Sequence, residues 1–494
     1  MSIVRNPIVL SGFSDFSGLF SINENMRFMP VTWILCKSLI AIFGLDHAAF
    51  HLANISLHAF NSAMLAYIFL KAFQINSHLD ATLGKAHLTA ALAFATLWAW
   101  HPMRVEPVSW STAITYHTCT AFFLMTLVAL LEYIYTPARR TKWELTYYLF
   151  FTLCVCSYAL AYTWAVTLCF LIPVLLSKQQ APSIKKSPQQ LFSHCRLIII
   201  SGLIALPPVC LTIWARIFQS STYYAPIDVN ISITERLQAM TIGTGYLFHR
   251  MLLPFDLTPA VWDEGVAFFP KTLLPFILLS LLGIALICCY RSTLAKRLRW
   301  LLLGTLALAL PIINPLENSS FYPQRYAHLL QAFVLFCLVL QIAQSQITVK
   351  KLWIVSSFSL MTAPISIALV LKELPKWENS SVLFDHIEQL PWANEPHSSL
   401  MLNRLRADNY AWEGDYEKAI TLYKKLITST PKNSLYWHQI GLCHFRMGDL
   451  ANAQYALENA IQSTNSPHPA ILRLLQHIEH LLLQESTNGN RPIK

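Results

Sequence analysis

The sequence predicts an all-α protein in two parts: a polytopic membrane domain of about ten transmembrane helices and a C-terminal tail of soluble helical repeats. Of its 494 residues, 54% are hydrophobic and only 13% are charged, whereas a soluble domain carries about 25% charged residues. The apolar residues gather in long runs up to about residue 374. The residues after 375 are more polar and have the spacing of paired helices, which predicts the second part.

The charge balance and the cysteines exclude several classes of protein. Lys and Arg number 36 against 26 Asp and Glu, a net charge of +10, and in a membrane protein such an excess indicates cytoplasmic loops rather than nucleic-acid binding. The 11 cysteines lie mostly inside apolar runs without CxxC spacing. Gly-rich phosphate loops, nucleophile elbows and HExxH motifs are missing from the sequence. We therefore expect no metal and no cofactor.

Residues 1–53 are expected to form an outer-face loop with one interfacial helix. The apolar piece 31–45 is interrupted by Lys37 and is shorter than the about 20 residues that a span requires. The membrane domain is expected at 54–374. Its predicted spans are 54–74, 86–100, 113–135, 146–161, 162–177, 196–217, 272–290, 299–315, 325–345 and 351–372.

Basic residues concentrate in alternate loops, which predicts the orientation of the domain. One set of loops carries Lys85; Arg139, Arg140 and Lys142; Lys178, Lys185, Lys186 and Arg196; Arg291, Lys296, Arg297 and Arg299; and Lys350 and Lys351. The positive-inside rule places these loops in the cytoplasm. The alternation holds only if the amphipathic stretch 234–252 lies on the outer surface without crossing. Both termini and the loop at 101–106 are then expected outside.

The loop between the second and third predicted spans is the first functional candidate. It holds His101, Arg104 and Glu106 between Trp98 and Trp110, and tryptophans suit the level of the lipid headgroups. A base, a guanidinium and an acid are thus held on one face of the membrane. The alternative is an ordinary interfacial turn whose charges meet water.

His117 lies inside a predicted span. An ionisable group there indicates function, although a neutral imidazole bonded to a neighbouring helix is nearly as good an explanation. The predicted spans hold few other polar groups, which disfavours a transporter.

The tail has the spacing of tetratricopeptide repeats. The matching positions are Ala407, Tyr410, Gly414, Asp415, Ala419, Tyr423 and Pro431, then Trp437, Gly441, Gly448, Asp449, Ala453, Leu457 and Ala460. Ala419 and Ala453 are 34 residues apart, the length of this repeat. We predict a linker at 375–399, repeats at 400–484 with a capping helix at 468–484, and a terminal segment at 485–494. Tyr410, Tyr423, Trp437 and His444 are the candidate partner-binding residues, with repeat packing as the alternative.

Four motifs in this order resemble the GT-C type of membrane glycosyltransferase, in the branch that joins a mannosyltransferase-like domain to tetratricopeptide repeats. They are Arg27-Phe-Met-Pro-Val-Thr32 with Phe43-Gly-Leu45, His51-Leu-Ala-Asn54 and Leu57-His58-Ala59; His101-Pro102 with Glu106 and Trp110; Glu235-Arg236 with Tyr246, Leu253-Pro254 and Leu257; and Pro311-Ile-Ile-Asn314 with Arg325-Tyr326. The resemblance covers essentially the whole chain.

The resemblance implies transfer of a sugar, typically mannose, from a polyprenyl-phosphate carrier to a hydroxyl acceptor on the periplasmic or lumenal side. A carboxylate must take the proton of the acceptor hydroxyl, and cations must face the leaving phosphate. By resemblance, Glu106 is the candidate catalytic carboxylate. Arg27, His58, His101 and Arg325 are the candidate phosphate or sugar contacts. The implied partners are the bilayer, the carrier-linked sugar and a protein or glycan acceptor that the repeats dock.

The sequence departs from this family in two places. One lies after Trp110, where relatives tend to carry Arg-x-Asp and this sequence has Thr115-Tyr-His117. The other is its start. Relatives carry a span and an acidic pair just before a stretch like Arg5-Asn-Pro7, whereas this sequence begins there. The expectation is therefore a truncated or mis-started chain, or a degenerate member that acts as a membrane-anchored repeat scaffold. A bacterial inner membrane with periplasmic repeats is the expected location, and the endoplasmic reticulum with lumenal repeats is the alternative.

Overall fold

The computed structural model describes residues 28–75, 81–177, 188–218, 245–255, 292–311, 324–345, 348–464 and 469–489, together with Leu19, Leu257 and Pro467. This described part is all-helical and contains no strand, which confirms the predicted all-α class. The helices before the tail are α2 (Pro30–Phe43), α3 (His47–Gln74), α4 (Ala81–Ala99), α5 (Val105–Ser109), α6 (Ile114–Tyr135), α7 (Arg140–Val155), α8 (Trp164–Leu176), α9 (Pro188–Phe218), α13 (Thr293–Ala309), α14 (Ala327–Gln344) and α15 (Val349–Glu373).

Five of the described helical segments are long and apolar enough to cross a membrane. These are His47–Gln74, Ser111–Tyr135, Leu191–Trp214, Gln324–Gln344 and Val349–Trp377. The predicted spans 86–100, 146–161, 162–177 and 299–315 overlap helices α4, α7, α8 and α13, which do not meet both the length and the hydropathy of a span. The predicted span 272–290 lies outside the described residues, as does most of the stretch 234–252, of which residues 245–252 are helical.

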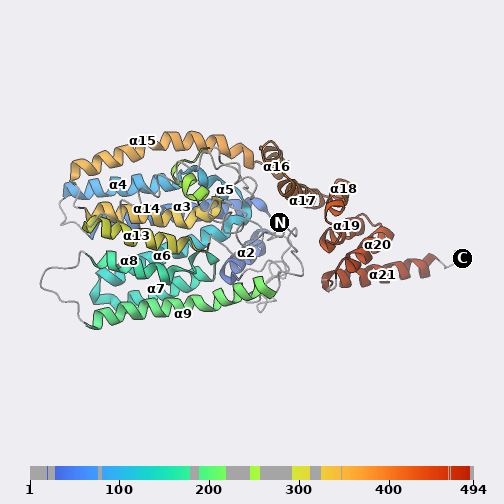
Figure 1. Cartoon of the computed structure of the whole chain (residues 1–494), viewed down its shortest axis with the longest axis horizontal. Coiled ribbons are helices and arrows are strands. Elements are labelled where there is room, and N and C mark those ends of the chain that lie inside the picture. The colour runs from blue at the N-terminus through green and yellow to red at the C-terminus, as the bar shows by residue number, and fades with distance from the viewer. Residues whose placement is uncertain are drawn as a thin grey trace.

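The helices run side by side along the long axis of the molecule, with α6 inside the bundle and α15 on its surface (Figure 1). Of the most apolar window of Ser111–Tyr135, 83% is buried, against 11% for Val349–Trp377. Helix α15 exposes Ile354, Phe358, Met361 and Ile365. An apolar surface this long is normally covered by lipid or by protein, so the bundle has the exterior of a membrane-associated protein.

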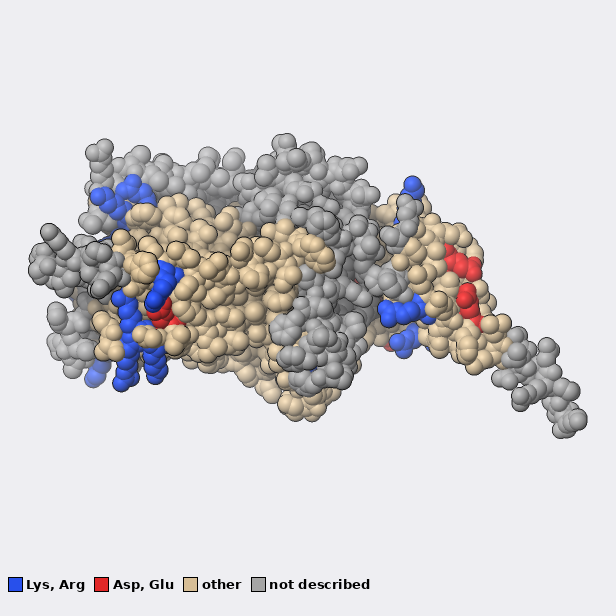
Figure 2. All heavy atoms as spheres, turned by 90° about the horizontal axis from the view of Figure 1, so that it is seen from below, with Lys and Arg blue, Asp and Glu red and all other residues tan. Residues whose placement is uncertain are grey.

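Basic side chains gather at the end of the bundle that lies away from the C-terminal helices (Figure 2). The end of α3, the turn between α6 and α7 and the start of α7 lie there, and they carry Lys71, Arg139, Arg140 and Lys142. Lys71 pairs with Glu132 at 2.6 Å. Arg139, Arg140 and Lys142, which belong to one of the predicted cytoplasmic loops, thus lie at a single end of the bundle.

The tail consists of short helices that pair through tight turns. They are α16 (Ser380–Glu388), α17 (Pro396–Glu413), α18 (Tyr416–Ser429), α19 (Ser434–Arg446), α20 (Leu450–Gln462) and α21 (Pro469–Gly489). Gly414 ends α17 with φ of 89°, and Gly448 follows α19 with φ of 78°, a region that glycine adopts without steric cost. The next residue in each case, Asp415 or Asp449, caps the following helix.

The structure of the tail differs from the sequence-based boundaries at the predicted linker. The predicted linker 375–399 contains α16 and the start of α17, and it continues from α15 through the single turn η8 (Leu374–Trp377). Helix α21 packs on α20, where a capping helix is expected. A Cβ on Gly441 would lie 2.9 Å from the Leu457 side chain, so α19 and α20 approach each other as closely as small-residue spacing predicts.

Candidate functional site

Polar groups from segments far apart in sequence meet at the end of the bundle that faces the tail. The loop after α4 forms the turn η3 (Pro102–Arg104), α5 and the turn η4 (Ser111–Ala113), and it packs against the turn η7 (Gln324–Tyr326) at the start of α14. Helix α5 also touches η8, and the rings of Trp110 and Trp377 are 6.2 Å apart. The predicted outer loop and the root of the tail therefore lie at the same end of the molecule (Figure 1).

Glu106 and Arg325 form a buried ion pair. Glu106 Oε1 accepts a hydrogen bond from the Arg325 guanidinium, and Oε2 accepts from the backbone N–H of Gln324 at 2.9 Å. Glu106 is only 1% exposed. Burial raises the pKa of the Glu106 carboxyl, whereas the Arg325 charge acts in the opposite direction. Since both oxygens have protein partners, Glu106 holds Arg325 in place and does not present a free carboxylate to a substrate.

Aromatic rings enclose the Arg325 side of this pair. The guanidinium carbon lies 4.1 Å from the centre of the Trp110 ring, and the Nε of Arg325 donates to the Tyr116 hydroxyl at 3.2 Å. Cations over aromatic faces are stabilised electrostatically, more so when water is excluded. Arg325, a predicted phosphate contact, is thus a buried cation surrounded by aromatic rings and paired with Glu106.

Arg104 is a second buried guanidinium, and its hydrogen-bond partners are neutral. It is 3% exposed, it donates to Nδ1 of His328 and Oε1 of Gln331, and it lies over the Trp98 ring at 5.1 Å. None of the ion pairs between described residues includes it, and its Nε has no partner there. Within the described residues, Glu106 is matched by Arg325, whereas Arg104 has no acidic partner.

His101 links the loop to the helical residues 245–252. Its Nε2 donates to the Met251 carbonyl at 3.1 Å, and its Nδ1 accepts from the Met103 N–H at 3.3 Å. Burial lowers the pKa of His101 to about 3, so the ring is neutral at physiological pH. Both nitrogens are occupied by backbone, which gives His101 a positioning role in place of the predicted phosphate contact.

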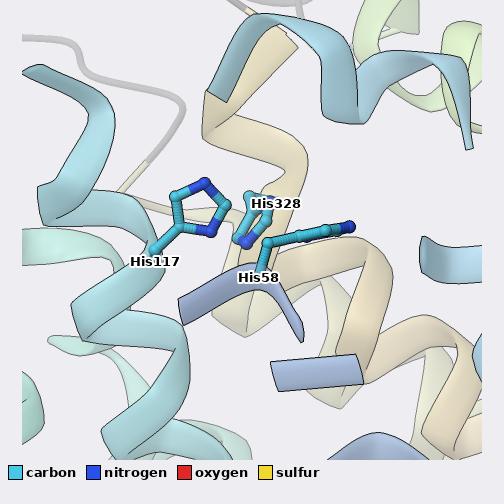
Figure 3. Close-up of side chains that lie close together, drawn as sticks. All are labelled: His58, His117 and His328. Carbon is cyan, nitrogen blue, oxygen red and sulfur yellow. The ribbon is translucent and has the colours of Figure 1, made fainter. Parts of the chain in front are cut away.

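Three histidines lie close together: His58 from α3, His117 from α6 and His328 from α14 (Figure 3). We term them the three-histidine centre. It lies beside Arg104, which donates to His328. One nitrogen from each ring lies within 4.8 Å of the other two, and among the described residues they are the group that could hold a metal ion. The His58 ring stacks on Trp98 at 5.2 Å. The predicted contact His58 therefore faces other histidines.

The other predicted site residues lie outside this cluster. Arg27 is outside the described residues. Tyr423 is fully buried, and its hydroxyl donates to Asp408 at 2.5 Å, so this residue packs inside the tail. His444 bonds to Asp449 at 3.1 Å. Tyr410 and Trp437 are half-buried and retain surface for a partner.

His328, Gln331 and Tyr116 were missed as site residues. The spacing of His328, three residues after Arg325 at a helix start, places both near one face and is the signal that could have found it. Comparisons with protein-family models, with curated proteins and with solved structures found no match.

Proposed function

We propose that the protein is a membrane glycosyltransferase-like protein that transfers a sugar, with mannose as the leading candidate, from a polyprenyl-phosphate carrier to a hydroxyl acceptor. The proposal combines the GT-C resemblance with the position of the polar cluster. The cluster lies at the end of the bundle opposite the basic loops and next to the tail. Such a position suits a lipid-linked donor, whose phosphate lies at the membrane surface.

The observation that carries this proposal is the Arg104 guanidinium, which has no ion-pair partner among the described residues. A buried charge is normally paired, and the described partners of Arg104, His328 and Gln331, are neutral. A phosphate is the anion that guanidinium recognises best. We assign Arg104 to the carrier phosphate and Arg325, held by Glu106, to the positive surroundings of the leaving group.

Glu106 takes a different role from the one that the resemblance implies. With one oxygen on Arg325 and the other on the Gln324 N–H, it acts as a positioning residue. The general base for the acceptor hydroxyl is then a carboxylate other than Glu106; the resemblance expects it in an acidic pair just before the stretch Arg5-Asn-Pro7, and residues 1–4 of this sequence contain no acid.

The proposed topology has about ten spans, with the cluster and the α16–α21 tail on the non-cytoplasmic side of a bacterial inner membrane; the endoplasmic reticulum is the alternative. The tail contributes a docking surface for a protein or glycan acceptor through its tetratricopeptide-like helix pairs. In sealed inside-out vesicles the tail is expected to resist added protease, and it should be cleaved once detergent opens them. Cleavage of the tail in intact inside-out vesicles would place the tail on the cytoplasmic side and contradict the proposed topology.

The proposed activity is tested with the full-length protein in nanodiscs, supplied with radiolabelled polyprenyl-phosphate mannose and a mixture of hydroxyl-bearing peptides. We expect release of the polyprenyl phosphate with label transferred to peptide, at a rate that rises with protein concentration. Binding of the donor without transfer would limit the protein to carrier recognition. If neither binding nor transfer occurs, the enzymatic proposal fails.

A membrane-anchored repeat scaffold is the second candidate. The observation that favours it is the full engagement of Glu106 by the protein's own groups. Under this reading the cluster only stabilises the bundle, and the half-buried Tyr410 and Trp437 belong to the functional surface. A scaffold would retain partner binding through the tail while showing no affinity for the lipid-linked sugar.

A further inference from the structure

The three-histidine centre has ring nitrogens that the rest of the protein leaves without partners. His117 and His328 are fully buried, and His58 is half-buried. In the described part of the chain, Nδ1 of His58, Nδ1 of His117 and Nε2 of His328 have no hydrogen-bond partner. Buried polar atoms are rarely left unsatisfied, and these three belong to rings that lie close together (Figure 3).

The opposite nitrogen of each ring fixes its tautomer. His58 Nε2–H donates to the Ala99 carbonyl and His117 Nε2–H to the Pro107 carbonyl, both at 3.0 Å. Their Nδ1 atoms are therefore bare lone pairs, since a neutral imidazole carries a single N–H. His328 is reversed, because its Nδ1 accepts from the Arg104 guanidinium and its Nε2 consequently carries the hydrogen. The centre thus offers two acceptors and one donor.

A metal ion does not match this set. A divalent cation requires a lone pair from every ligand, and His328 could supply one at Nε2 only by losing its last proton, since Arg104 already occupies Nδ1. The Glu106 carboxylate is already paired with Arg325. A dication would therefore lie beside the Arg104 guanidinium, which has no acidic partner among the described residues, and like charges repel strongly in a buried site.

We propose that the three-histidine centre binds a single water molecule. Its two hydrogens donate to Nδ1 of His58 and of His117, and its oxygen accepts from Nε2–H of His328, which satisfies all three nitrogens. Buried waters typically make about three hydrogen bonds of this kind. One nitrogen from each ring lies within 4.8 Å of the other two, a spacing that an oxygen about 2.8 Å from each nitrogen can bridge.

The water joins α3, α6 and α14 beneath the pair of Glu106 and Arg325 and links them to Arg104 through His328. It is consequently part of the structure and needs no lipid-linked sugar, so the inference stands whether or not the proposed function does. The centre is expected to keep its water in protein that shows no transferase activity.

The decisive comparison uses full-length protein in nanodiscs with two substitutions at one position. Asparagine in His117→Asn places an amide oxygen near the former Nδ1, so it still accepts from water but is a poor zinc ligand. Leucine in His117→Leu cannot accept, and both variants lose the bond to Pro107 equally. We expect the Tm to fall in the order wild type, His117→Asn, His117→Leu, with no response of any of them to Zn²⁺ or EDTA.

Metal content and density complete the test. After incubation with Zn²⁺ and gel filtration, the wild type should retain no more zinc than His117→Leu. High-resolution cryo-electron microscopy of the wild type should show one peak about 2.8 Å from all three nitrogens. One zinc ion per chain, lost in both variants, would overturn the proposal in favour of a metal site. Equal Tm values for the two variants would overturn it as well. If His117→Leu does not fold, His58→Asn and His58→Leu give the same comparison, because His58 is bonded in the same way.

Discussion

Replacing Glu106 by glutamine is expected to lower the free energy of unfolding by about 3–5 kcal/mol, the usual loss when one partner of a buried ion pair is removed. The amide still accepts from the Gln324 N–H, but the Arg325 charge loses its buried ion pair with Glu106 among Trp110, Tyr116 and Tyr326. The measurement is reversible unfolding of the purified protein in mixed detergent micelles, followed by tryptophan fluorescence.

The double variant Glu106→Gln with Arg325→Met separates the ion pair from mere packing. Removing both charges is expected to recover much of the lost stability, since an apolar replacement of a buried pair is often close to neutral. Glu132→Gln is the matched control, because its partner Lys71 is one-third exposed and such pairs contribute only about 0–1 kcal/mol. A loss in the double variant equal to the sum of the single losses would contradict a direct pairing.

Replacing Arg104 by glutamine is expected to reduce sugar transfer by about 10²- to 10³-fold, the effect of removing one charged or hydrogen-bonding group that stabilises a leaving oxyanion. Stability should change less than for Glu106, because the groups left behind, His328 and Gln331, are neutral. The rate is measured as label transferred from polyprenyl-phosphate mannose in nanodiscs.

Arg139→Gln provides the control for overall charge. Arg139 is exposed and lies at the opposite end of the bundle, so its removal should leave transfer unchanged. If transfer by the Arg104 variant equals that of wild type, the carrier phosphate does not meet this guanidinium, and the assignment of the cluster to the donor is lost.

Several of the spans and the helix ends of the tail can be predicted from the sequence because their signals are local. The apolar runs at 113–135, 325–345 and 351–372 correspond to candidate spans of the structure, since run length and hydropathy reflect burial in lipid directly. The Gly-Asp steps at 414–415 and 448–449 indicate helix ends through backbone conformation and capping, which also act over a few residues.

The arrangement inside the cluster was not accessible in the same way. Glu106 and Arg325 are 219 residues apart, and nothing local to Glu106 distinguishes a catalytic acid from an ion-pair partner. The sequence shows Arg104 only as part of a polar turn, because its neutral partners His328 and Gln331 come from the distant helix α14. Similarly, His117 was ambiguous until the Pro107 carbonyl and the two neighbouring histidines fixed its surroundings.

The connection from α15 through η8 into α16 is helical and limits the directions in which the tail can leave the bundle. Lys376 in η8 is tied to Glu373 at 2.8 Å and reaches the Leu257 carbonyl at 3.5 Å, so the chain leaves the bundle in a set direction. A flexible tether would sweep a molecule held by the tail through a wide volume and dilute it. If the tail docks an acceptor as proposed, the helical joint fixes the distance between the docking point and the polar cluster. Among molecules that bind the tail equally well, those whose reactive group lies at that distance from the docking point should then be favoured.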